Sequence, residues 1–503
     1  MDSQIESHIL SLASKKANIA RESITGYRIV RESIDARRKD IKINLSLRLF
    51  VDEEPRDFFE KVVFPDVSNK KQVIVVGSGP AGLFASLTLV ENGLKPIVIE
   101  RGKNVHERAK DCAKLSTSGI LSEDSNYAFG EGGAGAFSDG KLYTRSVKRG
   151  DVKKVLSLFV QHGANDEILY QSHPHIGSDK LPNVIENIRN TLLSAGAEVH
   201  FNTKVISLIK KDDRVIGVRC ENGEEFFAPV ILATGHSAKD VYSFLDAGAF
   251  RLEAKDVAVG VRLEHPQALI DRMQYHSKEG RGNYLPPASY SFVTQVENRG
   301  VYSFCMCPGG AIIPASTEYG YQVVNGMSSS SRLGKKANAA FVVEIKRNDL
   351  SEDGPLSMLR YIEGIEKMCY IPGFKAPGQR MVDFVEGRFS QTIIENTYKP
   401  GVESVEMDNV LPQIVSSSLR EAFKRFGKLS HGLFLTNDAL LVATETRTSS
   451  PVRILRDDGM RQCLGLYPAG EGAGYAGGIV SAAIDGTEVA INVANDIKRG
   501  LYG

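Results

Sequence analysis

The sequence has no surplus of charge of either sign. Its 62 Lys and Arg residues are balanced by 61 Asp and Glu residues, which leaves a formal net charge of +1. A chain that binds nucleic acid or an anionic membrane through its overall charge is usually far more basic. We therefore expect a small-molecule substrate, no nucleic acid and no membrane as the partner of this chain.

Cysteine is scarce, and no two cysteines have the CxxC spacing. Six cysteines among 503 residues exclude a disulfide scaffold, and the missing CxxC pairs exclude a zinc ribbon, so we expect no metal site. GxSxG, HExxH and P-loop signatures are also missing, which argues against the enzyme classes that these motifs define. The chemistry must therefore be sought in other motifs.

Long apolar runs are absent as well. No run of about 18 uncharged apolar residues occurs, so we expect no transmembrane helix. The N-terminus has no basic segment followed by an apolar core, so we expect no signal peptide and predict a cytoplasmic protein. Apolar residues make up 42% and charged residues 24% of the chain, values close to those of globular proteins.

The pattern along the chain predicts an α/β protein with several domains. A small α+β domain comes first, with a helix near residues 5–20 and strands within 27–51. A Rossmann-like domain in two parts then encloses a β-rich α+β substrate or cap domain. The predicted boundaries, in chain order, are 1–68 for the N-terminal domain, 69–244 and 441–503 for the two Rossmann-like parts, and 245–440 for the inserted domain.

A dinucleotide-binding motif opens the first Rossmann-like part. Residues 77–82 read GSGPAG, which matches GxGxxG, and they lie between an apolar strand and a helix. Gly79 lets the backbone approach a pyrophosphate, and the start of the helix supplies free N–H groups. Glu100, at the end of the next strand, can accept hydrogen bonds from a ribose diol and disfavours NADP at this site.

Three further segments indicate which dinucleotide binds. Residues 130–140 form a glycine-rich loop that can wrap a large planar ligand, and residues 231–235 form a strand that ends in small residues. Residues 469–479 precede the last helix. The start of that helix can face the negative charge of a reduced flavin.

These segments resemble the glutathione-reductase/p-hydroxybenzoate-hydroxylase superfamily of FAD proteins. The chain resembles even more closely a family of uncharacterised FAD-dependent dehydrogenases. The sequence motifs that carry this resemblance lie between residues 77 and 479 and read GSGPAGLFA, GAFSDGKL, ATGHS, VRLEHPQ, FCMCPGG, NGMS, ETRTSSPVR and AGEGAGYAGGI.

The resemblance implies FAD as the cofactor and a discontinuous FAD domain. It assigns FAD contacts to Gly77, Gly79, Gly82, Glu100, Gly235, Gly470, Glu471 and Gly478; superfamily members often have Asp where this chain has Glu471. The other candidate cofactor-binding residues lie in the same segments or beside them and are Pro80, Ala81, Arg101, Gly133, Gly135, Ser138, Gly140, Lys141, Val205, Ala233, Thr234 and Ile479.

Three residues are candidates for catalysis. Cys305 and Cys307 share one face if the strand is extended, with their Cα atoms about 6.6 Å apart. Such a pair can act as a flavin-coupled thiol pair, or it can be two small residues that are buried for packing. His265 can serve as a general acid or base, or as a structural histidine.

Four polar residues are candidates for substrate binding. Arginine can hold a carboxylate with its two-pronged guanidinium group. The candidates are Arg262, Asn325, Arg332 and Arg447, and surface ion pairs or a solvated loop are the alternative explanations.

The motifs together predict an FAD-dependent oxidoreductase, a dehydrogenase or reductase that acts on a small molecule. A second dinucleotide motif is missing from the sequence, so NAD(P)H would act only as a transient electron donor. Three alternatives remain open: an FAD-dependent aromatic monooxygenase, a flavin-dependent RNA-modifying enzyme, and a non-catalytic FAD-binding redox sensor that uses the two thiols.

Overall fold

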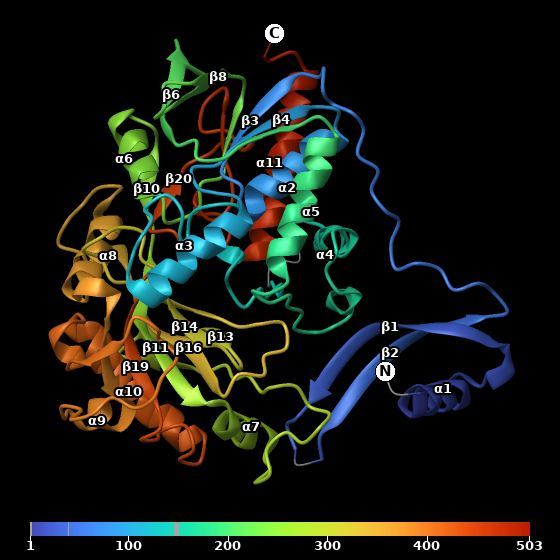
Figure 1. Ribbon diagram of the computed structural model, residues 1–503, viewed down its shortest axis with the longest axis vertical. Coiled ribbons are helices and arrows are strands. Elements are labelled where there is room, and N and C mark those ends of the chain that lie inside the picture. The colour runs from blue at the N-terminus through green and yellow to red at the C-terminus, as the bar shows by residue number, and fades with distance from the viewer. Residues whose placement is uncertain (1–2, 39, 145–149, 503) are drawn as a thin grey trace.

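The computed structural model describes residues 3–38, 40–144 and 150–502. Figure 1 shows a large body with a long N-terminal hairpin that projects from one side of it. Within the described ranges, no helix is both long and apolar enough to span a bilayer. The mixed α/β class predicted from the sequence is confirmed.

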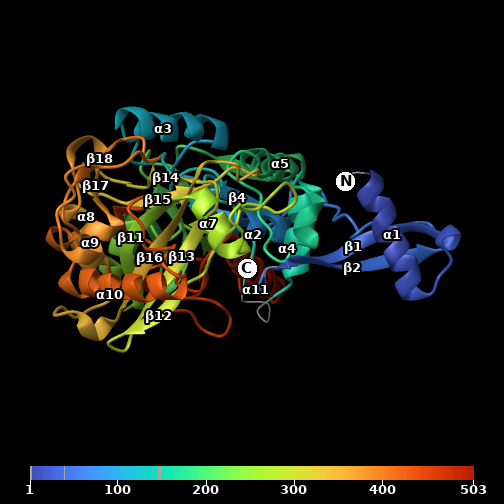
Figure 2. The same cartoon turned by 90° about the horizontal axis from the view of Figure 1, so that it is seen from below.

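The projecting unit consists of α1 (Ser3–Ala17) and an antiparallel ribbon of β1 (Ile24–Asp35) and β2 (Lys42–Val51). Figure 2 shows that the ribbon also extends away from the body in a second view. It joins the body near Glu32, whose N–H donates to the Tyr170 carbonyl (2.9 Å) and whose carbonyl accepts from the Ser172 N–H (3.1 Å).

A five-stranded parallel sheet forms the centre of the body. Its three central strands are apolar and buried except for Gln72 and Lys95 at their starts, as expected for a parallel sheet with helices on both faces. The strand order is β21 (Leu466–Pro468), β9 (Val230–Leu232), β3 (Gln72–Val76), β4 (Lys95–Ile99) and β5 (Glu198–His200). Segments that lie almost 400 residues apart in the chain therefore build one sheet.

Two helices pack against each other beside this sheet. They are α2 (Pro80–Glu91) and α11 (Ile479–Lys498), which lie side by side in Figure 1. Residues 81–90 of α2 are all buried, as expected for a helix enclosed on every side. Other helices of this half are α3 (Val105–Ser118), α4 (Val152–Gln161), α5 (Leu181–Ser194) and α6 (Lys239–Ala247), and a three-stranded antiparallel sheet adds β6 (Val205–Lys211), β7 (Arg214–Cys220) and β8 (Glu225–Phe227).

A seven-stranded mixed sheet forms the second half of the body. Its strand order is β12 (Val293–Val296), β13 (Arg299–Cys307), β16 (Lys336–Ile345), β11 (Val257–Pro266), β19 (Leu440–Glu445), β17 (Ala376–Arg380) and β18 (Val402–Ser404). Because β19 continues this sheet beyond residue 440, we propose that the second part of the FAD domain begins after residue 445 rather than at 441.

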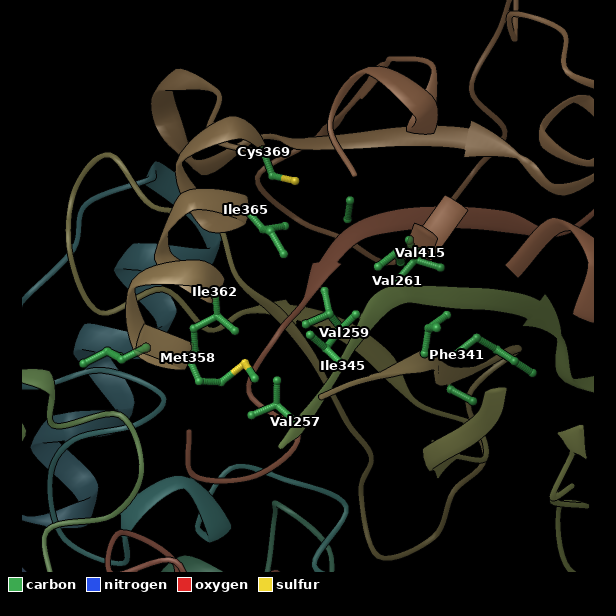
Figure 3. Packing of buried hydrophobic residues seen from close by; sticks show 14 of the residues in the cluster. Val257, Val259, Val261, Phe341, Ile345, Met358, Ile362, Ile365, Cys369 and Val415 are labelled. Atoms are coloured by element: carbon green, nitrogen blue, oxygen red, sulfur yellow. The ribbon is translucent and has the colours of Figure 1, made fainter. Parts of the chain in front are cut away.

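The core of the second half lies between this sheet and its helices. Figure 3 shows Val257 and Val259 of β11 on the side of Ile362 and Ile365 of α8, and Val261 next to Val415. The helices here are α7 (Gln267–Tyr275), α8 (Ser357–Met368), α9 (Met381–Glu386) and α10 (Gln413–Leu429), and two short ribbons pair β10 (Leu252–Ala254) with β20 (Val452–Ile454) and β14 (Ala311–Pro314) with β15 (Val324–Met327).

Candidate functional site

The turn between β3 and α2 needs two of its glycines for packing. Gly77 has a φ of +100°, and a Cβ at this position would lie 2.4 Å from the Ala233 carbonyl oxygen. A Cβ on Gly82 would lie 1.9 Å from the Gly77 carbonyl oxygen. The turn, the helix and strand β9 can therefore approach one another only where side chains are missing.

Two helices begin at glycines without a side-chain cap. Gly79 precedes α2 and Gly478 precedes α11, and neither helix start is capped by a side-chain hydrogen bond. A Cβ on Gly79 would meet only the Cα of Gly133, at 3.7 Å, and a Cβ on Gly478 would meet nothing within 4 Å. The first N–H groups and the positive dipole ends of both helices are thus free to face an anionic ligand.

Both helix starts open into one elongated cavity, which contains about 1570 Å³ of empty space up to and including its open mouth. It runs between the parallel sheet and the seven-stranded sheet. Of the predicted cofactor-binding residues, those that line it are Gly77, Gly79, Pro80, Ala81, Glu100, Arg101, Gly133, Gly135, Ser138, Gly140, Lys141, Val205, Ala233, Thr234, Gly235, Glu471, Gly478 and Ile479.

Two predicted cofactor-binding residues do not line this cavity. Gly82 faces the Gly77 carbonyl, and a Cβ on Gly470 would lie 2.6 Å from the Cβ of Ala81. The Gly470 N–H also donates to Asp485 (2.7 Å). Both glycines therefore allow close packing behind the cavity wall.

Glu100 connects the glycine turn to the glycine-rich loop. One of its oxygens accepts from the N–H (2.9 Å) and hydroxyl (2.7 Å) of Ser78, and the other accepts from the N–H groups of Gly102 and Gly130 (3.0 Å each). Its side chain is buried, with 5% of its surface exposed. The carboxylate is held rigidly where it can meet a ribose, and its four protein donors also fix the shape of the cavity.

His236 lines the cavity and was not among the predicted site residues. Its Nδ1 lies 3.8 Å from the Glu471 carboxylate. Burial lowers the pKa of His236, although Glu471 acts in the opposite direction, so the ring is held in its neutral form. Its position directly after Gly235 was the signal in the sequence that could have identified it.

The end of the cavity next to the seven-stranded sheet is more polar. Cys305, Asn325, Lys141 and Arg447 line it. Arg447 is already paired, since its guanidinium contacts the buried carboxylate of Glu366 at 3.2 Å. Lys141 is also engaged, since it pairs with Asp139 (3.3 Å), so Asn325 and Cys305 are the polar groups at this end that can best receive a ligand.

The two predicted thiols lie together, although only one faces the cavity. Cys305 is half-buried in the cavity wall, while Cys307 is fully buried behind it. A hydrogen bond from the Cys307 thiol lowers the pKa of Cys305 well below its ordinary value. Lys141 and Arg262 lower it further, and they outweigh the opposing effect of burial.

Arg262 supports this end of the cavity from behind. It is fully buried and is not part of the cavity wall. Its guanidinium lies 2.9 Å from the Glu445 carboxylate and donates to the Cys305 carbonyl (2.7 Å) and to the Asn325 side chain (2.6 Å). Each guanidinium nitrogen of Arg262 has a protein partner. Arg262 therefore positions Cys305 and Asn325 and has no nitrogen left to bind a substrate.

The structure places two other candidates away from the cavity. His265 is fully buried in an aromatic cluster, and its Nε2 contacts the Phe434 carbonyl at 2.9 Å. Arg332 forms an ion pair with the buried Asp139. Neither residue lines the cavity, so we no longer propose His265 for catalysis or Arg332 for direct substrate binding.

Within the described residues, no group of three or more His, Cys, Asp or Glu side chains is arranged to hold a metal ion. The two uncapped helix starts, the glycines of the cavity wall and the buried Glu100 carboxylate fit a dinucleotide.

Three family models match successive parts of the chain. An FAD binding domain matches residues 70–225, and the C-terminal domain of FAD-dependent proteins matches residues 256–448. A domain of unknown function matches residues 2–50, which include the projecting ribbon.

Two relatives match the chain in sequence. The chain is 40% identical over 504 residues to an uncharacterized protein of Clostridium beijerinckii, and the match covers 95% of this chain and 94% of that protein. It is also 28% identical over 211 residues to the protein FixC of Escherichia coli, with 41% of this chain and 46% of FixC covered.

Solved structures resemble the chain only distantly. A flavin-dependent brominase matches with 13% identity and a TM-score of 0.39, covering 86% of this chain and 79% of the brominase. A geranylgeranyl bacteriochlorophyll reductase-like protein of Thermoplasma acidophilum matches with 14% identity and a TM-score of 0.36, covering 86% and 80%.

Proposed function

The chain belongs to a family of FAD-dependent proteins that includes the Clostridium beijerinckii relative, and from this premise we propose that it is a dehydrogenase or reductase whose small-molecule substrate binds at the Cys305 end of the cavity. FAD as cofactor and oxidoreductase chemistry follow from the family. The observation that carries the proposal is the position of Cys305 and Asn325 in the wall of the same cavity as both uncapped helix starts.

We assign the residues along the cavity to successive parts of the cofactor. The start of α2 at Gly79 and Pro80 would hold the pyrophosphate, because its free N–H groups and dipole favour an anion. Glu100 would meet the adenosine ribose. The start of α11 at Gly478 and Ile479 would face the flavin ring and stabilise its negative charge after reduction.

Bound FAD would supply the two-electron chemistry. The chain's own residues bind and orient it and shape the space beside it. Asn325 is held by Arg262 (2.6 Å), so its amide is fixed in position and can orient a polar substrate group. Burial lowers the pKa of His236, and its ring nitrogens can accept or donate a proton.

The test is FAD retention by matched glycine variants. Gly79 has a φ of −73°, so Gly79→Val should fold, while its side chain would occupy the space of the pyrophosphate. Gly364→Val is the control, because Gly364 faces solvent in α8 and has no heavy atom near an added Cβ. We expect the wild type and the control to purify yellow with about one FAD per chain, and Gly79→Val to lose at least ten-fold in FAD affinity.

The second part of the test measures whether a panel of electron donors reduces the bound flavin. The wild type should show anaerobic bleaching of the flavin band with NADH, NADPH or an organic hydride donor, and a bound product analogue should slow it. Normal FAD content in Gly79→Val would disprove the placement of the pyrophosphate. A wild-type protein that cannot be loaded with FAD would disprove the proposed function.

A further inference from the structure

We propose that Cys305 and Cys307 form a redox-active dithiol that exchanges an electron pair with the FAD, with Cys305 reacting from the cavity side and Cys307 closing the disulfide behind it. This inference rests on the proposed function, because the FAD is the electron acceptor or donor. It assigns a different role to each of the two cysteines.

The backbone brings the two cysteines together through an irregularity in β13. Strand β13 pairs Phe304 with Ala340 of β16, and its next pair is Cys307 with Asn338, so the register shifts between them. Cys305, inside this bulge, has a φ of +44°. A regular strand would hold the two Cα atoms about 6.6 Å apart, near the upper limit for a disulfide. The bulge instead turns the Cys307 thiol back onto Cys305, where it donates to the Cys305 carbonyl (3.4 Å).

A left-handed conformation is costly for a residue with a side chain and persists only where its surroundings enforce it. Two cations hold this segment. Arg262 donates to the Cys305 carbonyl (2.7 Å), and Lys141 donates to the carbonyl of Met306 between the cysteines. Gly326 makes room for Arg262, since a Cβ on Gly326 would lie 3.0 Å from the guanidinium. The strained turn is therefore built by residues from three separate parts of the chain.

The charges around the pair favour a thiolate at Cys305. Lys141 and Arg262 both lower its pKa, and the carboxylates that face them are already paired: Asp139 with Lys141 (3.3 Å) and Glu445 with Arg262 (2.9 Å). The neighbouring Cys305 sulfur and burial both raise the pKa of Cys307, which favours its protonated form. A Cys305 thiolate that faces the cavity and a Cys307 thiol behind the cavity wall are the two protonation states that a dithiol needs before oxidation.

The other four cysteines have no such surroundings. Burial raises the pKa of Cys112 and Cys220 to about 11, that of Cys369 to about 12, and also that of Cys463. All six cysteines lie in the described part of the chain, and Cys305 is the one whose pKa is lowered. The lowered pKa of Cys305 is thus caused by the surroundings of this one cysteine.

The proposed step balances in atoms and electrons. The Cys305 thiolate and the Cys307 thiol form one S–S bond and give up two electrons and one proton, and oxidised FAD takes up both electrons and that proton. The reverse step reduces the disulfide. An external disulfide or thiol substrate can reach only Cys305, because Cys307 is fully buried. The structure therefore favours a substrate that exchanges with Cys305.

The first experiment is an anaerobic dithionite titration of the air-oxidised, FAD-loaded protein with mass mapping of its cysteine peptides. We expect the wild type and the control Cys463→Ser to take up two electron pairs per FAD, and Cys305→Ser and Cys307→Ser to take up one. The mapped wild-type peptide should carry a Cys305–Cys307 bond before titration and two free thiols after it. One pair per FAD in the wild type, with no linked peptide, would overturn the inference.

The second experiment measures alkylation of Cys305 by iodoacetamide across pH in the reduced protein, read by peptide mass. At pH 7 we expect Cys305 to react roughly five- to ten-fold faster than an ordinary thiol. Cys307→Ser should keep part of this advantage, because a hydroxyl can still donate to the thiolate, whereas Lys141→Met should shift the midpoint to higher pH. A midpoint equal to that of a free thiol would contradict the assigned role of Cys305.

The outcomes separate this inference from the proposed function. A protein that binds FAD and oxidises no thiol leaves the proposed function standing and removes the dithiol. A protein that cannot bind FAD removes both, and the alkylation profile then reports only the charges that the chain itself provides.

Discussion

Arg262 shows how much a single residue of this protein depends on its partners. It is a cation with no exposed surface, and its guanidinium meets a carboxylate, a carbonyl and an amide oxygen. Burial raises the pKa of its partner Glu445 to about 7, although Arg262 acts in the opposite direction. A charge in such a place is stable only while its partner is present.

We therefore expect Arg262→Met to lower the free energy of unfolding by about 3–5 kcal/mol, because it leaves the Glu445 carboxylate buried and unpaired. The double variant Arg262→Met/Glu445→Leu should recover most of this loss. Urea unfolding of the two single variants and the double variant measures the coupling. Additive losses would show that the pair does not interact as the structure indicates.

His265 provides a prediction for pH dependence. Burial lowers its pKa to about 4, from an ordinary value near 6.5. Between these values the unfolded chain binds a proton that the folded chain does not, so stability falls as the pH drops from about 6.5 to about 4. The contribution of this residue at pH 5 is roughly 2 kcal/mol.

The measurement is the unfolding free energy of the wild type and of His265→Gln at pH 7.5 and pH 5. The wild type should lose roughly 2 kcal/mol more than the variant on acidification. Equal losses would show that His265 titrates normally in the folded protein.

At the scale of elements, the contact between α2 and α11 depends on small residues. A Cβ on Gly486 would lie 2.1 Å from the Ala81 carbonyl oxygen, so the two helices can approach only with a glycine there. The start of α11 faces the cavity, and its position therefore depends on a contact two turns further along the helix.

We expect Gly486→Val to lower the melting temperature, with a destabilisation of at least about 2–3 kcal/mol, because the backbone of α2 must move. Gly364→Ala is the control and should raise stability by about 0.5–1 kcal/mol, since it favours an exposed helix without a clash. Thermal unfolding in the presence of FAD measures the stability of both variants. An unchanged melting temperature in Gly486→Val would contradict the described packing.

At the scale of the whole molecule, the N-terminal unit contacts the body through Glu32 and through Ala36 and Ile41, which pack against the large hydrophobic core. The described residues that line the cavity all come from position 76 onward. The segment after the ribbon nevertheless contacts the body, since Val62 and Phe64 pack against a hydrophobic cluster and the Val67 N–H donates to the Ala195 carbonyl (2.8 Å).

Deletion of residues 1–56 should therefore leave FAD content close to that of the full chain and lower the melting temperature slightly, because it removes the Ala36 and Ile41 contacts. Deletion of residues 1–66 should lower the melting temperature further, because it also removes Val62 and Phe64. Absorbance of the flavin and thermal unfolding compare the three chains. Loss of FAD in the shorter deletion would show that the N-terminal unit contributes to the site.

The sequence alone determined the cofactor class and the fold class, and most of the residues it proposed for the cofactor line one cavity. FAD and the α/β fold with its interrupted domain were predicted correctly, because a strand, a glycine turn and a helix start are local features that neighbouring residues specify. The prediction of β-rich texture after residue 245 likewise followed from local alternation of side chains.

Only the tertiary structure decided which polar residues face the cavity. Arg262 and Glu445 are 183 positions apart in the chain, so their pairing, and with it the burial of Arg262, has no local signal. For the same reason the sequence could not separate the buried His265 from the cavity-lining His236, or show that a bulge turns Cys305 toward the cavity. Burial and charge pairing arise from contacts between distant segments, and these contacts exist only once the two sheets have come together.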